Sequence, residues 1–268
     1  MRLFPLLFAA LLALPVAGQA QVSAPVNLKV YSAGSLRAAW LDLAQAYEAK
    51  SGVKIAFEFG ASGLLRERLA KGETADLFTS ADTGHPQALA SAGLAQPMQV
   101  FAGNKLCALA QPGLGLTQAN LLERLLDPAV RVGSSTPKAD PSGDYTWMMF
   151  ERAGKVKPGA FETLSSKAMQ LVGGPNSPPP PKDRTAYGKF MEDRVADVFV
   201  AYCTNGVLAK AEVPRLVTVA LPENLAVTAT YGMVQMQGAQ PAASSLADYL
   251  LSDRAQKILA DHGFAALK

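Results

Sequence analysis

Gly34 and Ser35 stand where a predicted strand gives way to a predicted helix. Leu28, Val30 and the aromatic Tyr31 precede them, and a helical pattern begins at Leu36. The first N–H groups of a helix have no internal partner, and the helix dipole makes that end positive. Glycine lets a ligand approach the backbone closely, and the serine hydroxyl adds a neutral donor. This junction can therefore bind an anion, although by itself Ser35 is equally explained as an N-cap and Gly34 as a turn residue.

The same arrangement of strand, small residues and helix recurs along the chain. Strands that alternate with helices predict an α/β fold with a parallel, doubly wound sheet, whose ligands bind beyond the carboxyl ends of the strands. The hydroxyl groups at these ends should therefore lie near one another. The recurring positions are Ser62 with Gly63 after a strand at 54–59, Ser80 at the end of a strand at 75–80, and Ser142 with Gly143 before a helix at 145–153.

The sequence lacks the residue patterns of common catalytic and metal sites. Its two histidines, His85 and His262, are too few for most metal cages, and no Cys-x-x-Cys pair occurs. The segment 60–63 is not a Gly-x-Ser-x-Gly nucleophile elbow, and no Walker-type loop is present. We therefore expect a protein that is not an enzyme and that uses neither a cofactor nor a bare metal cation.

The N-terminal residues 1–20 have the pattern of a secretory signal peptide. Arg2 supplies a positive start, 3–14 is apolar, and small residues end at Ala20, where we expect cleavage. Without Arg2 the chain has 24 basic and 22 acidic residues, and no basic block suggests nucleic acid as a partner. We therefore expect an exported protein of the bacterial periplasm.

Two cysteines, Cys107 and Cys203, each lie in an apolar run of the expected mature chain. In an oxidising compartment, a disulfide between adjacent strands would account for them. Free cysteine is also among the most buried residue types, so two separate buried thiols are the alternative. The sequence leaves both possibilities open.

The change of residue pattern near Gly103 and a strand that crosses back at 219–222 divide the chain into two predicted lobes. The first lobe should contain 27–101 and 221–268, and the second 102–220. Further strands are predicted at 106–110, 130–133, 197–202, 216–221 and 226–237, and further helices at 86–92, 120–126, 161–168, 185–193, 246–251 and 254–262.

Five segments, in this order and at these spacings, together resemble the periplasmic molybdate-binding proteins of ABC importers. The resemblance covers essentially the whole expected mature chain. It implies two α/β lobes, each a mostly parallel sheet flanked by helices, joined by two crossovers that allow the lobes to close on a tetrahedral oxyanion. Serine hydroxyls, backbone amides and a tyrosine hold the anion in that family, without a positive side chain. The segments are 31–36, 59–63, 75–82, 140–145 and 199–202.

Matched segment by segment, the resemblance assigns hydroxyl donors to Ser35, Ser62 and Tyr202 and backbone donors to Ser142 and Arg184. Ser142 and Arg184 stand where the family usually has small apolar residues. An arginine in the cleft would suit a carboxylate, phosphonate or sulfate, whereas an arginine that points to solvent would contribute only its amide. Secondary candidates are Gly34, Gly63, Ser80 and Gly143.

A site built only from donors would prefer an anion that carries no proton. We therefore expect molybdate or tungstate to bind better than phosphate, whose proton needs an acceptor, and sulfate to bind less well because it is smaller. An aspartate such as Asp140 or Asp183 could accept that proton but would repel a fully ionised anion. The alternatives are another anion or small organic acid, and a ligand sensor for a membrane receptor. The implied partners are permease and ATPase subunits, with the binding protein itself a monomer.

Overall fold

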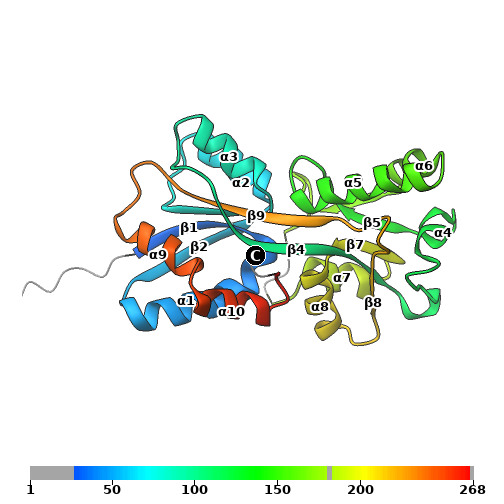
Figure 1. Ribbon diagram of the computed structural model, residues 1–268. Coiled ribbons are helices and arrows are strands. Elements are labelled where there is room, and N and C mark those ends of the chain that lie inside the picture. Colours follow the sequence, from blue (N-terminus) through cyan, green and yellow to red (C-terminus); the bar gives the residue numbers. More distant parts are fainter. Residues whose placement is uncertain (1–26, 180–182, 266–268) are drawn as a thin grey trace, which may run out of the picture.

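One sheet of nine strands extends through the structure, a computed structural model that describes residues 27–179 and 183–265 (Figure 1). The predicted signal peptide at 1–20 lies outside these residues. The strands follow the order β2-β1-β3-β9-β4-β7-β5-β6, with β8 paired to β4. Their bounds are β1 Asn27–Ala33, β2 Lys54–Gly60, β3 Leu77–Ser80, β4 Gln99–Ala110, β5 Val132–Ser135, β6 Met169–Val172, β7 Val198–Tyr202, β8 Val217–Ala220 and β9 Thr228–Gln235.

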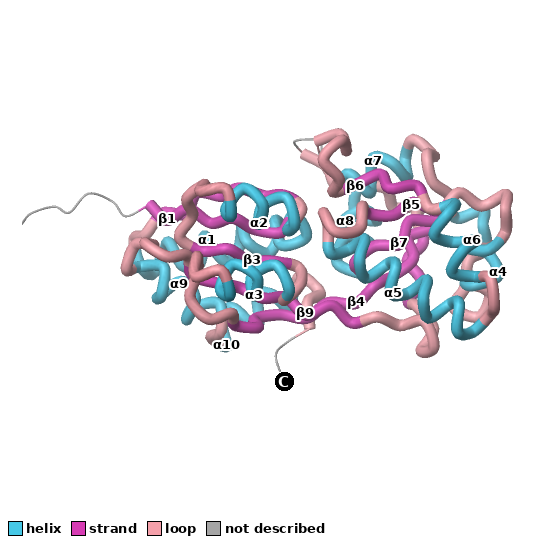
Figure 2. Tube along the Cα trace, turned by 90° about the horizontal axis from the view of Figure 1, so that it is seen from above, coloured by secondary structure: helices cyan, strands magenta, loops and turns pink. Residues whose placement is uncertain are grey.

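Helices cover this sheet in two groups, which define two lobes (Figures 1 and 2). The first lobe has α1, α2, α3, α9 and α10 around β1, β2 and β3, and the second has α4 to α8 around β5 to β8. The helix bounds are α1 Arg37–Ser51, α2 Ser62–Ala70, α3 Gly84–Ser91, α4 Leu121–Leu126, α5 Pro141–Val156, α6 Ala160–Lys167, α7 Ala186–Glu192, α8 Cys203–Glu212, α9 Ala242–Leu250 and α10 Asp253–Asp261. Two short 3-10 helices are Gly34–Leu36 and Pro112–Leu114.

Each lobe contains the parallel strand pairs that the alternation of strands and helices predicts. β1 pairs in parallel with β2 and β3, and β5 pairs in parallel with β6 and β7. The helices pack apolar faces on these strands: Trp40 and Leu43 of α1 are fully buried in the same core as Leu28 and Val30 of β1. The fold is therefore the predicted two-lobed α/β architecture.

The strands β4 and β9 connect the lobes. β4 pairs with β9 through 99–105 and with β7 and β8 through 106–110, so one strand belongs to the sheets of both lobes. The sequence predicted a strand only from 106, because Gly103 and Asn104 interrupt the apolar pattern. That prediction was too short: β9 supplies cross-strand partners for this part, and Gly103 also pairs with Ala265 in an isolated bridge.

Two elements of the second lobe were missing from the prediction. β6 is short and precedes a proline-rich segment. Its four residues are only partly buried or exposed, so they lack the apolar pattern of a buried strand. α8 begins at Cys203, directly after β7, where the sequence predicts a strand at 197–202 and no following helix. This junction is a further instance of the change from strand to helix that the sequence shows elsewhere.

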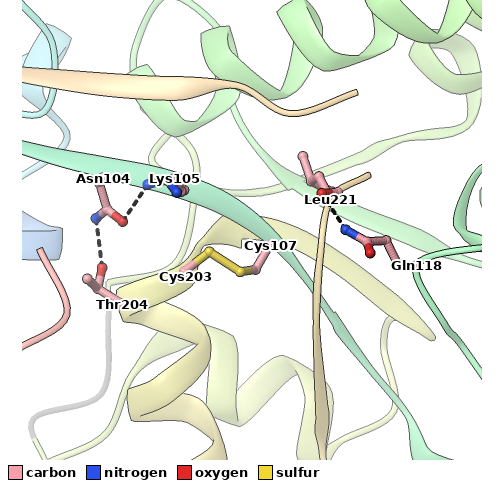
Figure 3. The surroundings of a disulfide bond; sticks show 7 residues. All are labelled: Asn104, Lys105, Cys107, Gln118, Cys203, Thr204 and Leu221. Carbon is pink, nitrogen blue, oxygen red and sulfur yellow. Dashed lines mark hydrogen bonds between the residues drawn. A yellow bond between two sulfur atoms is a disulfide. The ribbon is translucent and has the colours of Figure 1, made fainter. Parts of the chain in front are cut away.

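The structure confirms the disulfide and excludes the alternative of two free thiols. Cys107 lies in the second half of β4 and bonds to Cys203, the first residue of α8, with a Cα–Cα distance of 4.8 Å (Figure 3). The adjacent Thr204 accepts a hydrogen bond of 2.9 Å from the side chain of Asn104 on the same strand. The start of α8 is therefore attached to the connecting strand both covalently and by a buried polar contact.

Replacing both cysteines by serine should lower the free energy of unfolding. The disulfide spans 96 positions, and the chain-entropy model gives about 4–5 kcal/mol for a loop of about this size, an upper value in practice. Urea unfolding of the oxidised protein, the reduced protein and the double variant measures the effect, and the last two should agree. Titration of the unfolded, unreduced protein should find no free thiol; two thiols per chain would contradict the structure.

Candidate anion-binding site

A cavity of about 350 Å³ lies between the lobes, beyond the ends of several strands. The first lobe contributes the start of α1, the start of α2 and Ala81 after β3. The second lobe contributes the segment after β6 and the starts of α7 and α8. The cavity therefore lies at junctions where strands end and helices begin, where ligands of such sheets bind.

Five of the nine predicted site residues line this cavity: Gly34, Ser35, Ser62, Arg184 and Tyr202. They come from both lobes, so closing the lobes brings them together. The other four, Gly63, Ser80, Ser142 and Gly143, lie behind the walls and are not among the lining residues.

Three hydroxyl groups face the cavity from different elements. Ser62 Oγ accepts a 3.1 Å hydrogen bond from the Ala81 amide, which leaves the serine proton free to donate to a ligand. Ser35 Oγ lies 2.9 Å from the hydroxyl of Tyr231. The Tyr202 hydroxyl donates its one proton to the Ala81 carbonyl in a long bond of 3.4 Å, and burial raises its pKa, so it stays neutral; it would donate to a ligand by exchanging this long bond for one to the ligand. The three groups form a neutral donor set.

Two of the predicted backbone donors are used inside the protein. The Ser142 amide donates to Oδ1 of Asp140 at 3.0 Å, and the Gly63 amide donates to the Ala139 carbonyl at 2.9 Å. Asp140 is the N-cap of α5, with Pro141 in the first turn, an arrangement that this sequence pattern favours. The expectation of a site with donors only therefore differs from the structure, in which an acceptor stands at this helix end.

The secondary candidates Ser80 and Gly143 have local roles. Ser80 Oγ donates to Asp82 at 2.6 Å, and the Gly143 amide donates to the Asp140 carbonyl at 2.8 Å. A Cβ atom at Gly143 would lie 2.5 Å from backbone atoms of Thr136 and Pro137. Glycine is therefore needed there for close packing, which is the kind of reason the sequence pattern alone could not separate from ligand contact.

Asp140 lines the cavity, and the sequence analysis did not place it among the site residues. Burial raises the pKa of its carboxyl to about 6, while bonds from the Ser142 amide and the Ser135 hydroxyl act in the opposite direction. The nearby carboxylate of Asp144 also raises the pKa of Asp140, because its negative charge disfavours the ionised form. No described residue forms an ion pair with Asp140, so its negative charge is offset only by hydrogen bonds.

A buried polar cluster lies next to Asp140. The hydroxyls of Tyr187 and Ser135 are 3.3 Å apart, and Ser142 Oγ is buried without a hydrogen-bond partner. Burial and the charge of Asp140 raise the pKa of Tyr187, which remains a neutral donor. Tyr187 and Asn205 both line the cavity. No sequence signal separated these residues from ordinary helix positions, because the topology alone brings α7, α8 and β5 together.

Arg184 reaches the cavity wall, but its charge is balanced by acidic neighbours. Its guanidinium pairs with Glu192, and its Nε lies 3.6 Å from Glu212. Its side chain keeps 32% of its surface exposed. Arg37, on the opposite wall, is exposed and lies 4.3 Å above the ring of Phe59. Arg184 therefore belongs to a surface ion-pair group, and Arg37 offers a cation close to the cavity.

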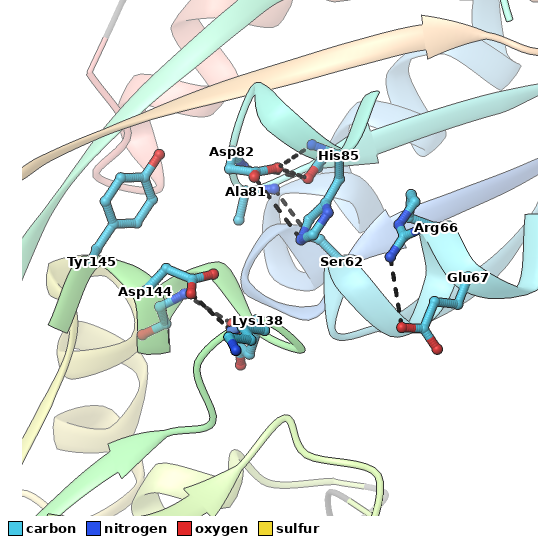
Figure 4. Close-up of polar contacts among 12 residues, drawn as sticks. Ser62, Arg66, Glu67, Ala81, Asp82, His85, Lys138, Asp144 and Tyr145 are labelled. Atoms are coloured by element: carbon cyan, nitrogen blue, oxygen red, sulfur yellow. Dashed lines mark hydrogen bonds and ion pairs between the residues drawn. The ribbon is translucent and has the colours of Figure 1, made fainter. Parts of the chain in front are cut away.

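The lobes are in contact beside the cavity. A Cβ atom at Gly63 would lie 2.5 Å from the Lys138 carbonyl oxygen, so the start of α2 packs directly on the loop before α5. Figure 4 shows Asp82 and His85 of the first lobe opposite Asp144 and Tyr145 of the second. These contacts describe lobes closed around the cavity.

This fold and this cavity between lobes define a solute-binding protein with two lobes. The chain belongs to the family of bacterial extracellular solute-binding proteins, whose model matches residues 28–265. That family consists of binding proteins and not of enzymes. Among the residues that the structure describes, no helix combines the length and the apolar character needed to span a bilayer.

Two curated relatives differ in how much of the chain they match. An uncharacterised protein of Pasteurella multocida is 37% identical over 180 residues, 66% of this chain and 74% of the relative. The molybdate-binding protein ModA of Mycobacterium bovis is 32% identical over 124 residues, 42% of this chain and 48% of the relative.

Solved structures of similar fold are named for several anions. The sulfate-binding protein SubI of Mycobacterium tuberculosis has a TM-score of 0.77 at 16% identity, covering 91% of this chain and 88% of its own. The periplasmic molybdate-binding protein of Azotobacter vinelandii has a TM-score of 0.72 at 20% identity, and the match covers 90% of this chain and 100% of that protein. PEB3 of Campylobacter jejuni, bound to L-phospholactate, has a TM-score of 0.69 at 20% identity, and the match covers 90% of this chain and 100% of PEB3. At these identities the likeness shows the fold.

Asp140→Asn should stabilise the ligand-free protein at neutral pH. An ordinary aspartate has a pKa of 3.8 and Asp140 about 6, so between these values the folded state keeps a proton that the unfolded state has lost. Stability therefore falls as pH rises from about 4 to 6 and stays lower above. Asparagine keeps the N-cap acceptor without the charge, and we expect a gain of about 1–3 kcal/mol at pH 7.5.

Urea unfolding at pH 4 and pH 7.5 measures this effect. The difference between the variant and the parent protein should be large at pH 7.5 and small at pH 4. Asp183→Asn, at an exposed position, removes the same charge and should change stability little at either pH. An equal difference at both pH values for Asp140→Asn would contradict the raised pKa.

Proposed function

We propose that this protein captures a small oxyanion in the cavity between its lobes and delivers it to an ABC importer. The observation that supports this most directly is the convergence of the Ser35, Ser62 and Tyr202 hydroxyls from both lobes on one cavity. Neutral donors hold an oxyanion through hydrogen bonds, each of which contributes about 1.5–3 kcal/mol when the acceptor is charged. Several such bonds reach submicromolar affinity, which needs about 8 kcal/mol net.

Molybdate or tungstate is our first candidate ligand. The motif resemblance supports it, and so do the names of the Mycobacterium bovis relative and the Azotobacter vinelandii structure. The neutral hydroxyl set suits a fully ionised tetrahedral anion once the Asp140 carboxyl is protonated, because no fixed cation is then required.

A small organic acid or phosphate ester is the second candidate, and the size of the cavity favours it. Its volume of about 350 Å³ lies in the range of pockets for small organic ligands and exceeds the needs of a five-atom anion. The Asp140 carboxyl and the Arg37 guanidinium could bind a hydroxyl and a second acidic group. The L-phospholactate complex of PEB3 shows that this fold also holds an organic phosphate.

The proposed transport role carries further assignments. The lobes divide into 27–101 with 221–268 and 102–220, and they hinge at β4 and β9. The signal peptide at 1–20 directs export to the periplasm, where the monomer meets permease and ATPase subunits. A sensor that reports the same ligand to a membrane receptor remains the alternative, and the genes beside this one would separate the two roles.

Ligand binding should stabilise the closed lobes. Protein stripped of ligand by unfolding and refolding should have a larger radius of gyration than the protein saturated with molybdate, because the hinge opens. Small-angle X-ray scattering with and without the anion measures the change. An identical profile under saturation would contradict closure by the hinge.

Substitutions at the cavity wall should weaken binding in proportion to the donors lost. Ser62→Ala and Tyr202→Phe should each reduce molybdate affinity by tenfold or more, about 1.4 kcal/mol or above. Arg184→Ala should change binding little, because Glu192 and Glu212 balance its charge. Arg37→Ala separates the two candidates: a small effect supports an anion held by neutral donors, whereas near-complete loss supports an organic acid. Calorimetry and thermal shift with a panel of oxyanions measure each effect.

Matched controls for this experiment lie away from the cavity. Ser166→Ala removes an exposed hydroxyl of α6, and Tyr249→Phe removes a buried hydroxyl that has no hydrogen-bond partner. Both should bind as the parent protein does. The absence of heat and of a thermal shift with molybdate and tungstate would exclude them as ligands, and binding of an organic acid would then support the second candidate.

A further inference from the structure

We propose that Asp140 makes anion capture at this site proton-coupled: the bound anion shares one proton with the Asp140 carboxyl. The proton arrives on the anion when the anion is protonated, and the carboxyl takes it from solvent when the anion is fully ionised. Asp140 is thereby a specificity-determining residue that favours anions carrying a hydroxyl proton. The inference rests on the proposed function, because it requires that an anion binds in this cavity.

Geometry holds the carboxyl of Asp140 at the cavity wall. Its Oδ1 accepts the Ser142 amide as the N-cap of α5. Gly173, which also lines the cavity and has a φ of +77°, packs against the other side: a Cβ atom there would lie 2.3 Å from Oδ2. The side chain is therefore fixed by a cap on one oxygen and by close packing at the other, and an anion that enters the cavity meets it.

The charges on the cavity wall add to zero only when one acid is protonated. Two basic residues, Arg37 and Arg184, face three acidic residues, Asp140, Asp183 and Glu212. A net charge of −1 repels an anion, and one proton removes this charge. Asp140 is the acid that takes it up, because Glu212 pairs with Arg184 and Asp183 is exposed to water.

The groups that face Asp140 from the neighbouring elements favour its protonation. Asp144, one turn along α5, adds negative charge and raises its pKa. Burial raises the pKa of Tyr187 on α7, Tyr202 at the end of β7 and Tyr231 on β9, and the charge of Asp140 adds to the rise, so these three stay neutral. Burial already brings the pKa of Asp140 to about 6, and a second negative charge in the cavity raises it further.

Calorimetry at pH 8 in buffers of different ionisation enthalpy counts the protons. The parent protein should take up about one proton for each molybdate or sulfate bound, and close to none for hydrogen phosphate, which brings its own. Asp140→Asn should take up none with any of the three. It should also bind the two fully ionised anions at least tenfold more tightly than the parent protein at pH 8, because about 1% of a carboxyl with a pKa of about 6 is protonated there.

Asp183→Asn removes the same charge from the cavity wall and should keep the proton uptake. If the uptake depended only on the net charge of the wall, this variant would lose it as Asp140→Asn does. Molybdate or sulfate binding without proton uptake, or uptake that persists in Asp140→Asn, would overturn the inference and leave the proposed function standing. If none of the three anions, and no organic phosphate, binds to the parent protein, both fail. A cap role alone predicts no change in proton number, since asparagine also caps the helix.

Discussion

The pairing of β4 with β9 is the constraint on which the rest of the structure depends. These two antiparallel strands are the only described part of the sheet that joins the lobes, so every contact across the cavity is set by how they bend. A buried polar chain lies on them: Asn104 donates to Thr204 of the second lobe and to Tyr231, whose hydroxyl meets Ser35 in the first. Ser35, which lines the cavity, is thus linked by hydrogen bonds to the strands that join the lobes.

The proposed anion site combines neutral donors with a carboxyl, and this combination would decide which anions remain bound. In that proposal Ser62 and Tyr202 stabilise negative charge without choosing among anions of similar shape. The Asp140 carboxylate repels a bound anion, and this repulsion is removed only when the carboxyl and the anion share a proton. Selectivity in such a site therefore arises from the one unfavourable group and not from the favourable ones, which agrees with the general role of repulsive elements in specificity.

The fold and one part of the site were predictable from local patterns. Ser35 and Ser62 follow apolar strands directly and precede helices, so chain order alone places them at the carboxyl ends of strands. Asp140 was named as a possible acceptor of the phosphate proton but not among the site residues, because a capping aspartate has the same sequence signal whether or not a cavity lies beside it. Tyr187 could not be found, since its position depends on how α7 packs against β5. The continuous β4 was missed because Gly103 breaks the pattern that its partner strand sustains.

The bond from Cys107 to Cys203 joins the connecting strand to the residue next to Tyr202. In a reducing compartment this bond would not persist, and the start of α8 would be held to β4 by noncovalent contacts alone. In an oxidising compartment it fixes the tyrosine relative to the hinge before any anion arrives. If the protein is exported as proposed, oxidation there would complete the second-lobe wall of the cavity, whereas a chain kept in a reducing compartment would hold Tyr202 less firmly.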